Sequence, residues 1–347
     1  MSSISYLPGK EPHPREHRLI FKNVDRVGWN TSIDCAMADG GYEMLKKALG
    51  MERSAITNEV KASGLRGRGG AGFPTGVKWG FIPPTNTKPV YLICNADESE
   101  PGTFKDRYII HQDPHQLIEG TIISCFANNV KQAYIYIRGE MPHGARILEK
   151  AIAEAREKNF VGQNILGSAY SCEIYVHRGA GAYICGEESA MIESIEGKRG
   201  MPRLRPPYVA QVGLFGRPTL EHNFETLYWV RDIVERGPQW FASHGRHGRH
   251  GLRSFSVSGR VREPGVKLAP AGITLRELVD EYCGGLPEGH ELYGYLPGGA
   301  SGGILPASLA DIPLDFDTLQ PHGCFIGSAA VMVLTKSATH VDRAVDA

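Results

Sequence analysis

The sequence feature that most constrains the fold is a glycine-rich stretch at residues 64–79, which reads GLRGRGGAGFPTGVKW. Six of its sixteen residues are glycines, and Arg66, Arg68 and Lys78 add positive charge. Glycine backbones can lie close to a ligand, and successive amides can converge on an anion. Cationic side chains nearby favour a phosphate. The stretch predicts a loop that holds a phosphate-bearing cofactor, and the alternative is a flexible surface loop.

The same stretch matches the pattern G-x-G-x-x-G at residues 67–72, which is typical of dinucleotide-binding Rossmann units. That pattern has its meaning only between a strand and a helix. Residues 55–63 have helical spacing instead and end at a glycine, as a helix C-terminus would. Downstream, Phe73-Pro74 argues against immediate entry into a helix. We therefore expect a phosphate loop but not an ordinary Rossmann fingerprint.

Length and composition exclude several classes of protein. The 347 residues suggest two domains, or one domain with an appendage. Lysine plus arginine equals aspartate plus glutamate at 38 each, so no global charge indicates nucleic acid or membrane binding. The N-terminus lacks a signal peptide's apolar core, and no apolar run approaches the roughly 18 residues that span a bilayer. We expect a cytoplasmic protein without membrane insertion.

The seven cysteines are never closer than thirteen residues apart. This spacing excludes a C-x-x-C motif, a zinc or iron–sulfur site and a compact disulfide framework. The odd count fits reduced thiols in a cytoplasmic protein. We therefore expect no metal ligands in this chain.

Short apolar runs alternate with helical patterns in the first two thirds of the chain. Strands are expected at residues 89–94, 132–138 and 172–177, and helices at 41–49, 54–63, 104–112, 115–128, 142–158 and 219–236, with a turn at 83–88. This alternation predicts a doubly wound α/β layer, with ligands beyond the carboxyl ends of the strands. Residues 1–40 are expected to be an N-terminal arm and residues 41–247 the α/β domain.

The last third of the chain has a different sequence pattern. Residues 243–251 repeat His-Gly-Arg and read as a linker. From residue 252 strands are short and glycines frequent, with one helix at 273–282 and a β-rich tail at 324–335. We predict a small α+β domain at residues 248–347.

Two acidic clusters are candidates for cofactor contacts. Residues 95–100 place an amide and three acids at a predicted strand end, where they can hydrogen-bond ribityl or ribose hydroxyls or ring N–H groups. Residues 179–189 form a second glycine-rich turn with Glu187 and Glu188 at a helix start. The alternatives are a solvated capping loop and a plain N-cap. Residues 105–107 read as surface or helix-start charges.

Two further motifs are misleading. Residues 299–303 match G-x-S-x-G, the nucleophile elbow of hydrolases, but Ile304-Leu-Pro follows where a helix should begin and no triad partner is identifiable. His244, His247 and His250 resemble a metal-binding tract, yet they lie among glycines and arginines without a fixed scaffold. We reject both a serine hydrolase and a metal site.

Taken together, the motifs resemble the flavoprotein subunit of NADH-oxidising complexes. That family includes the NADH-binding subunit of respiratory complex I and the diaphorase subunits of soluble NAD-linked hydrogenases and formate dehydrogenases. The matching blocks are residues 64–79, 94–107, 177–196, 202–207 and 213–227. The variants at 199–208 and 219–225 are most similar to the formate dehydrogenase branch, with complex I or a hydrogenase as the alternative. An alternative of another class is a non-catalytic nucleotide-binding assembly subunit.

The resemblance implies a diaphorase that transfers hydride between nicotinamide C4 and flavin N5, with no catalytic side chain. It implies FMN contacts from Gly67, Arg68, Gly69, Lys78, Asn95, Asp97, Glu98, Tyr183, Gly186, Glu187 and Asn223. It implies NAD(H) contacts from Phe73, Phe81, Glu100, Glu188, Arg205 and Tyr208. The family usually has Lys, Phe and Asn where this chain has Arg205, Tyr208 and His222. The last difference puts one flavin contact in question.

The resemblance also implies a Rossmann-like fold, a ubiquitin-like (β-grasp) insert from about residue 250, and redox partners. In the family a later helical domain binds a [4Fe–4S] centre through C-x-x-C-x-x-C, a motif that this sequence does not contain. The expected partners carry iron–sulfur clusters: a thioredoxin-like [2Fe–2S] subunit and a catalytic formate dehydrogenase or complex I subunit.

Overall fold

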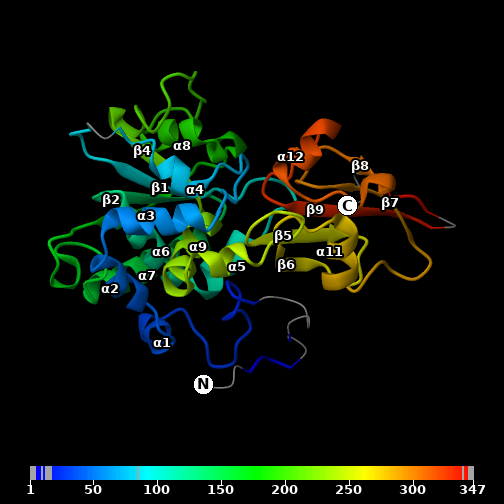
Figure 1. Ribbon diagram of the computed structural model, residues 1–347, viewed down its shortest axis with the longest axis horizontal. Helices are drawn as coiled ribbons and strands as arrows, with labels where there is room; N and C mark the ends of the chain where they lie inside the picture. The colour runs from blue at the N-terminus through cyan, green and yellow to red at the C-terminus, as the bar shows by residue number, and fades with distance from the viewer. Residues whose placement is uncertain (1–4, 9–10, 12–17, 84–85, 338–339, 343–347) are drawn as a thin grey trace.

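The computed structural model describes residues 5–8, 11, 18–83, 86–337 and 340–342. Most of the first seventeen residues of the predicted arm, and residues 84–85 of the predicted turn, lie outside the described residues. The described chain forms two lobes, each built on its own sheet (Figure 1). The first lobe contains the glycine-rich stretch, and the second begins at Leu252.

The sheet of the first lobe has four parallel strands in the order β3-β2-β1-β4. These strands are β1 (Tyr91–Ala96), β2 (Gln132–Ile137), β3 (Glu173–Arg178) and β4 (Thr219–Asn223). Leu92 and Cys94 of β1 are buried in the main core on one face, whereas Ile93 is buried in a smaller core on the other. Apolar burial on both faces explains why the strand reads as a continuous apolar run.

Helices cover both faces of this sheet. The face with the main core carries α3 (Arg53–Ala62), α6 (Pro114–Ala127), α7 (Pro142–Glu157) and α9 (Phe224–Arg236), and the opposite face carries α8 (Glu188–Ile195) (Figure 1). Shorter helices are α1 (Ile33–Ala38), α2 (Glu43–Leu49), α4 (Thr75–Trp79), α5 (Asp106–Gln112) and α10 (Pro238–Ala242). Helices on both faces of a parallel sheet confirm the predicted doubly wound, Rossmann-like fold.

The strand order creates a topological switch point between β1 and β4. The chain runs from β1 through β2 to β3 in one direction and then returns to place β4 on the other side of β1. At the carboxyl ends Asn95 of β1 pairs in register with Asn223 of β4. A crevice opens at such a point in open α/β sheets, and ligands bind there.

The prediction of one helix at residues 219–236 is wrong in its first five residues. Thr219–Asn223 is strand β4, and α9 begins at Phe224, where the Asn223 side chain accepts a hydrogen bond from the amide of Glu225 at 3.0 Å. Leu220 and Phe224 are both fully buried. Their spacing of four suits a helix face, so the apolar period alone could not locate the boundary.

The loop of the glycine-rich stretch, residues 64–74, lies between two helices, α3 and α4, and the last five residues of the stretch form α4. Among the described residues no strand precedes the loop, which agrees with the rejection of the Rossmann fingerprint. The expectation of no immediate helix after Phe73-Pro74 is wrong, because α4 begins at Thr75. Pro74 keeps an extended conformation (φ −60°, ψ 118°) as the N-cap. A proline restricts the residue before it but not the residue after it, so a helix can start at once.

The second lobe is a mixed five-stranded sheet in the order β6-β5-β9-β7-β8. Its elements are β5 (Leu252–Gly259), β6 (Gly265–Pro270), α11 (Leu275–Tyr282), β7 (Glu291–Leu296), β8 (Leu305–Pro306), α12 (Phe316–Leu319) and β9 (Ala330–Lys336). The hairpin β5–β6 is antiparallel, and β9 returns parallel to β5 in the centre. This arrangement is the expected β-grasp. The predicted β-rich tail starts only at Ala330, since residues 324–329 form no strand and the chain turns at residues 327–328.

The predicted linker at residues 243–251 is held against the second lobe. Arg246 donates two hydrogen bonds to Glu281 at 2.8 and 2.9 Å, and Arg249 pairs with Asp315 at 2.8 Å. The His-Gly-Arg repeat therefore supplies ion pairs that fix this segment, which corrects its interpretation as a plain linker. From the predicted arm, Ile20 and Phe21 are buried in the core of the first lobe.

Candidate functional site

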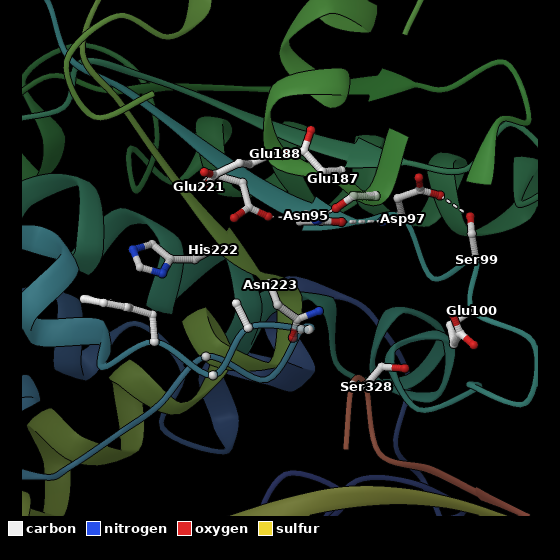
Figure 2. Close-up of a pocket in the computed structure, with 18 of the residues that line it drawn as sticks. Asn95, Asp97, Ser99, Glu100, Glu187, Glu188, Glu221, His222, Asn223 and Ser328 are labelled. Atoms are coloured by element: carbon white, nitrogen blue, oxygen red, sulfur yellow. Dashed lines mark hydrogen bonds between the residues drawn. The ribbon is translucent and has the colours of Figure 1, made fainter. Parts of the chain in front are cut away.

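A cavity of about 930 Å³ opens at the switch point, beyond the carboxyl ends of β1 and β4. Its walls come from the glycine-rich stretch, the acidic loop after β1, the start of α8 and loops of the second lobe (Figure 2). It brings together Gly67, Gly69, Phe73, Lys78, Phe81, Asn95, Asp97, Glu98, Glu100, Tyr183, Gly186, Glu187, Glu188, Arg205, Tyr208 and Asn223. Arg68 is the one predicted site residue outside this lining.

The glycine loop forms one wall of the cavity. A hydrogen bond from the Gly67 amide to the Phe73 carbonyl closes the loop at 2.9 Å. Between these residues, the amides at positions 69–72 donate to no other residue that the structure describes. Helix α9 begins beside the loop, since a Cβ on Gly69 would lie 3.3 Å from Cβ of Asn223. Open amides next to the N-terminus of a 13-residue helix suit an anion.

Arg68 points away from the cavity. Its guanidinium donates to the carbonyls of Arg66 and Leu252 at 2.8 and 2.7 Å, and burial lowers its pKa. Arg66 donates to the carbonyl of Gly72 at 2.7 Å. Both arginines therefore support the loop from behind, and the geometry does not match the expectation that their charges face a ligand.

Asn95 and Asp97 continue from the end of β1 into the cavity. The Asn95 side-chain amide donates to the Gly186 carbonyl at 2.9 Å and to Glu221 at 2.7 Å, while its oxygen accepts from the Asp97 amide at 3.0 Å. Asp97 accepts from Ser99 through one oxygen, and its buried Oδ2 has no hydrogen-bond partner among the described residues. Burial raises the pKa of Asp97. This carboxylate is open to a donor from a ligand.

Glu98 caps the helix that follows it, and residues 105–107 stand at the start of that helix, which confirms their interpretation as helix-start charges. The surface alternative is wrong for Lys105 and Asp106, which are buried. Glu98 accepts from the amides of Asp106 and Arg107 at 2.7 and 3.3 Å and so caps α5. Lys105 is only 1% exposed and pairs with Asp106 at 2.7 Å and Glu225 at 2.9 Å. Burial raises the pKa of Asp106 to about 7. Asp106 also lines the cavity.

Glu100 joins the two lobes across the cavity. It accepts two hydrogen bonds from Ser301 of the second lobe, from the amide and the hydroxyl, each at 2.8 Å. The Tyr183 hydroxyl donates to the same carboxylate. Thr103 and Ser328 form a second hydrogen-bonded pair between the lobes. The second lobe is therefore part of the cavity wall.

Glu187, Glu188 and Glu221 gather near Asn95 (Figure 2), and Lys78 pairs with two of them. Lys78 Nζ lies 3.1 Å from Glu188 and 3.4 Å from Glu221. Burial alone would lower the pKa of Lys78, but the two carboxylates outweigh it and raise the pKa. Arg205 pairs with Glu187 and, at 3.1 Å, with Glu188. Glu187 also caps α8 by accepting from the amides of Ser189 and Ala190, as an N-cap would.

Aromatic side chains line the more open side. The rings of Phe73 and Phe81 are 5.4 Å apart and 43% and 49% exposed, and Tyr208 is 57% exposed. Rings left this open in a cavity suit stacking against a planar ligand. His222 is buried deeper and accepts from Trp79 at 2.9 Å. Burial and the nearby Lys78 lower the pKa of His222, so the ring is neutral.

Several lining residues were missed by sequence reasoning. Glu221 fell inside the segment that was predicted as helix. Others are Ser99 and Thr103 of the acidic loop, Val209, Ala210 and Gln211, and Gly298, Ser301, Phe325, Gly327 and Ser328 of the second lobe. No cofactor motif marks the five second-lobe positions, because only the docking of the two lobes brings them to the cavity. Ser99, Thr103 and residues 209–211 belong to the first lobe, where they lie in or directly after segments that the motifs did mark.

The misleading motifs have structural roles. Ser301 of G-x-S-x-G hydrogen-bonds to Glu100, and strand β8 rather than a helix follows. Among the described residues, no group of three or more His, Cys, Asp or Glu side chains could hold a metal ion. Within the same residues, no helix has the length and apolar character needed to cross a membrane.

Comparisons with known proteins identify close relatives. The family model described as the Nuo51 FMN-binding domain matches residues 60–232. An NADH-quinone oxidoreductase subunit of Rhizobium meliloti is 51% identical over 327 residues, which are 94% of this chain and 77% of the relative. NADH dehydrogenase (ubiquinone) flavoprotein 1 of Dictyostelium discoideum is 50% identical over 326 residues, covering 91% of this chain and 68% of the relative.

Solved structures show the same likeness. A chain of NAD+-reducing NiFe hydrogenase in the H2-reduced state is 38% identical with a TM-score of 0.74, covering 84% of this chain. The air-oxidised state of such an enzyme gives 37% identity and a TM-score of 0.71. This chain spans about half of the hydrogenase chain, at 48% of its length.

Proposed function

Because this chain belongs to the family of the Nuo51 FMN-binding domain, we propose that it is the FMN- and NAD(H)-binding subunit of a larger redox complex. The relatives described above are subunits of NADH dehydrogenases and a chain of a NAD+-reducing hydrogenase. They support the complex I or hydrogenase alternative better than the formate dehydrogenase assignment. In either case the reaction is hydride transfer between NAD(H) and FMN.

The observation that carries the proposal is the meeting of the glycine loop and the acidic loop in one cavity. The open amides at residues 69–72 and the N-terminus of α9 suit the phosphate of FMN. Asp97 Oδ2, buried and without a described partner, suits a ribityl hydroxyl, which supplies the missing donor. The residues present therefore fit the cofactor.

The cavity also suits a second planar ligand. Its volume of about 930 Å³ is near the upper end of ordinary ligand pockets, which hold roughly 300–1,000 Å³. Phe73 and Phe81 offer exposed ring faces at the open side, where a nicotinamide ring could stack. Glu100 and Glu188 would repel a 2′-phosphate, which favours NAD(H) over NADP(H).

When bound, FMN supplies the hydride chemistry, and the side chains supply orientation and electrostatics. Asn95 is held in one orientation by the Gly186 carbonyl and Glu221. Glu100 is fixed by Ser301 of the second lobe and by Tyr183, so the second lobe forms one wall of the cavity. No side chain has to accept or donate a proton for hydride transfer.

Partners follow from the electron count. A hydride brings two electrons at once, whereas iron–sulfur centres take one at a time. We propose that electrons pass to or from iron–sulfur clusters on redox partners, among them a thioredoxin-like [2Fe–2S] subunit. The partner at the far end of that path, a complex I, hydrogenase or formate dehydrogenase subunit, is identified by the masses of co-purifying chains.

The test is flavin content followed by anaerobic reduction. Protein purified with FMN present should release FMN rather than an adenine nucleotide on denaturation, near one per chain. Stoichiometric NADH should then bleach the flavin absorbance. A chain that takes up no flavin would support the assembly-subunit alternative, and bound FMN that NADH fails to reduce would contradict the nicotinamide site.

A further inference from the structure

Glu221 is a buried carboxylate in the cavity that the proposed hydride transfer does not use. It lies on β4 two residues before Asn223, and its side chain is 12% exposed. One oxygen accepts from the Asn95 side chain at 2.7 Å, and the other lies 3.4 Å from Lys78 Nζ. Figure 2 shows Glu221 beside Glu188, at the end of β1. Glu221 thus faces the same space as the proposed flavin contacts.

The charges around Lys78 do not balance. One ammonium lies between Glu188 at 3.1 Å and Glu221 at 3.4 Å. Arg205, the other basic side chain of the lining that carries a fixed charge, is already paired with Glu187 as well as Glu188. With Glu221 ionised, the group formed by Lys78, Arg205 and these three carboxylates has a net charge of about −1. Little positive charge is left to stabilise a further anion.

We propose that Glu221 lowers the reduction potential of the bound flavin by neutralising Lys78. This inference rests on the proposed function. A hydride carries one proton and two electrons, so the C–H bond of the nicotinamide breaks, the nicotinamide is oxidised, and one negative charge enters the cavity with the reduced flavin. A fixed carboxylate nearby opposes that charge, and the effect is strong where water is excluded. Glu221 therefore makes the bound flavin a stronger reductant toward NAD+.

The variant that tests the proposal is Glu221→Gln. Glutamine keeps the size and the oxygen that Asn95 uses, and it removes only the charge. At a fixed ratio of NADH to NAD+, the ratio of reduced to oxidised flavin should rise roughly tenfold. Glu149→Gln on the exposed side of α7 is the matched control, with the same charge change outside the cavity lining. It should leave the ratio unchanged.

Coupling to Lys78 separates an electrostatic role from a structural one. Lys78→Gln should shift the flavin toward the oxidised form. It also removes the cation that opposes the burial-raised pKa of Glu221, so the carboxyl group takes up a proton and adding Glu221→Gln should change the ratio less than it does in the wild type. Melting temperatures measured in parallel report on folding alone. Additive effects of the two substitutions would overturn the route through Lys78.

An unchanged or lowered ratio in Glu221→Gln with a full complement of FMN would overturn the proposal. If Glu221→Gln does not hold FMN, the variants Glu221→Met and Glu221→Asp separate the two explanations. FMN retained by Glu221→Met, with a raised ratio of reduced to oxidised flavin, supports a charge effect. FMN retained by Glu221→Asp alone would show that Glu221 serves to bind the flavin and does not set its reduction potential. Failure of the proposed function is distinct, since the wild type would then hold no FMN at all.

Discussion

Arg68 and Lys78 carry the same charge in the same glycine-rich stretch, yet only Lys78 lines the cavity. Arg68 finds two backbone carbonyls behind the loop, at Arg66 and Leu252. Lys78 lies on α4 and reaches Glu188 and Glu221 instead. The sequence predicted the kind of side chains at the site. It could not predict their directions, because Leu252, Glu188 and Glu221 come from segments more than a hundred residues away.

Gly69 allows the loop to pass close to the start of α9. A Cβ there would lie 3.3 Å from Cβ of Asn223, so the two branches of valine would force the loop or Asn223 to move. We expect Gly69→Val to weaken FMN binding at least tenfold while the protein still folds. Flavin fluorescence titration measures the affinity. Gly50→Ala, at the end of α2 and outside the cavity lining, is the control. Unchanged affinity in Gly69→Val would contradict the phosphate-loop assignment.

The buried carboxyl group of Asp106 should make the free energy of unfolding depend on pH. Burial raises its pKa from 3.8 to about 7. Between these values the folded protein binds a proton that the unfolded chain has lost, so stability falls as pH rises from about 4 to 7. The loss is on the order of 1.4 kcal/mol for each pKa unit.

In Asp106→Asn this contribution is absent. Urea unfolding of both proteins at several pH values gives the difference in their unfolding free energies, which should shift in favour of Asp106→Asn as pH rises through this window. A difference that stays constant, or that shifts in favour of the wild type, would show that Asp106 is ionised throughout as the ion partner of Lys105.

Among the secondary-structure elements, most helices and buried strands of the first lobe were predicted from the spacing of apolar residues along the sequence. The strand at β1 and the helices α3, α6 and α7 lie close to where they were predicted. Strand β4 was missed, because its five residues merge with the apolar period of α9. Glu221 lies on this strand and was therefore not predicted as a site residue. A strand becomes recognisable at this position only through its pairing with β1, and that pairing is tertiary.

Helix α12 of the second lobe supports the glycine loop through Phe316. The Phe316 ring contacts both Arg66 and Arg253, whose guanidinium carbons are 4.7 and 5.0 Å from its centre. It also fills the space beside Gly72, since a Cβ on that glycine would come within 2.1 Å of the ring. Phe316→Ala removes this support, and we expect FMN affinity to fall several-fold.

The control for this prediction is Tyr293→Ala, which removes a 52% exposed ring from β7 of the same lobe. Both variants are compared by flavin titration and by thermal unfolding. Equal affinities with a lower melting temperature in Phe316→Ala would mean that the ring stabilises the lobe without shaping the glycine loop.

For the whole molecule, the cavity exists because two separately built sheets meet over it. Glu100 and Ser301 are 201 positions apart in sequence and are joined by two hydrogen bonds. Glu225 at the start of α9 likewise accepts from the amide of Ser254 in β5 at 3.1 Å. Sequence motifs predicted the parts of the site that come from the glycine loop and from the acidic residues 95–100 and 187–188. The part formed by the second lobe depends on docking, which leaves no periodic or local signal.

The last prediction concerns which electron acceptors the isolated chain can reduce. Under the proposed function the flavin exchanges a pair of electrons with NAD(H), and the proposed partner clusters take one electron at a time. All seven cysteines are free thiols, and six of them are buried. We expect the isolated 347-residue chain with FMN to reduce ferricyanide or a dye with NADH, without an iron–sulfur signal in electron paramagnetic resonance. Metal analysis that found about four irons per chain would reveal a cluster. Bound FMN without dye reduction would instead mean that the aromatic side of the cavity does not accept NADH.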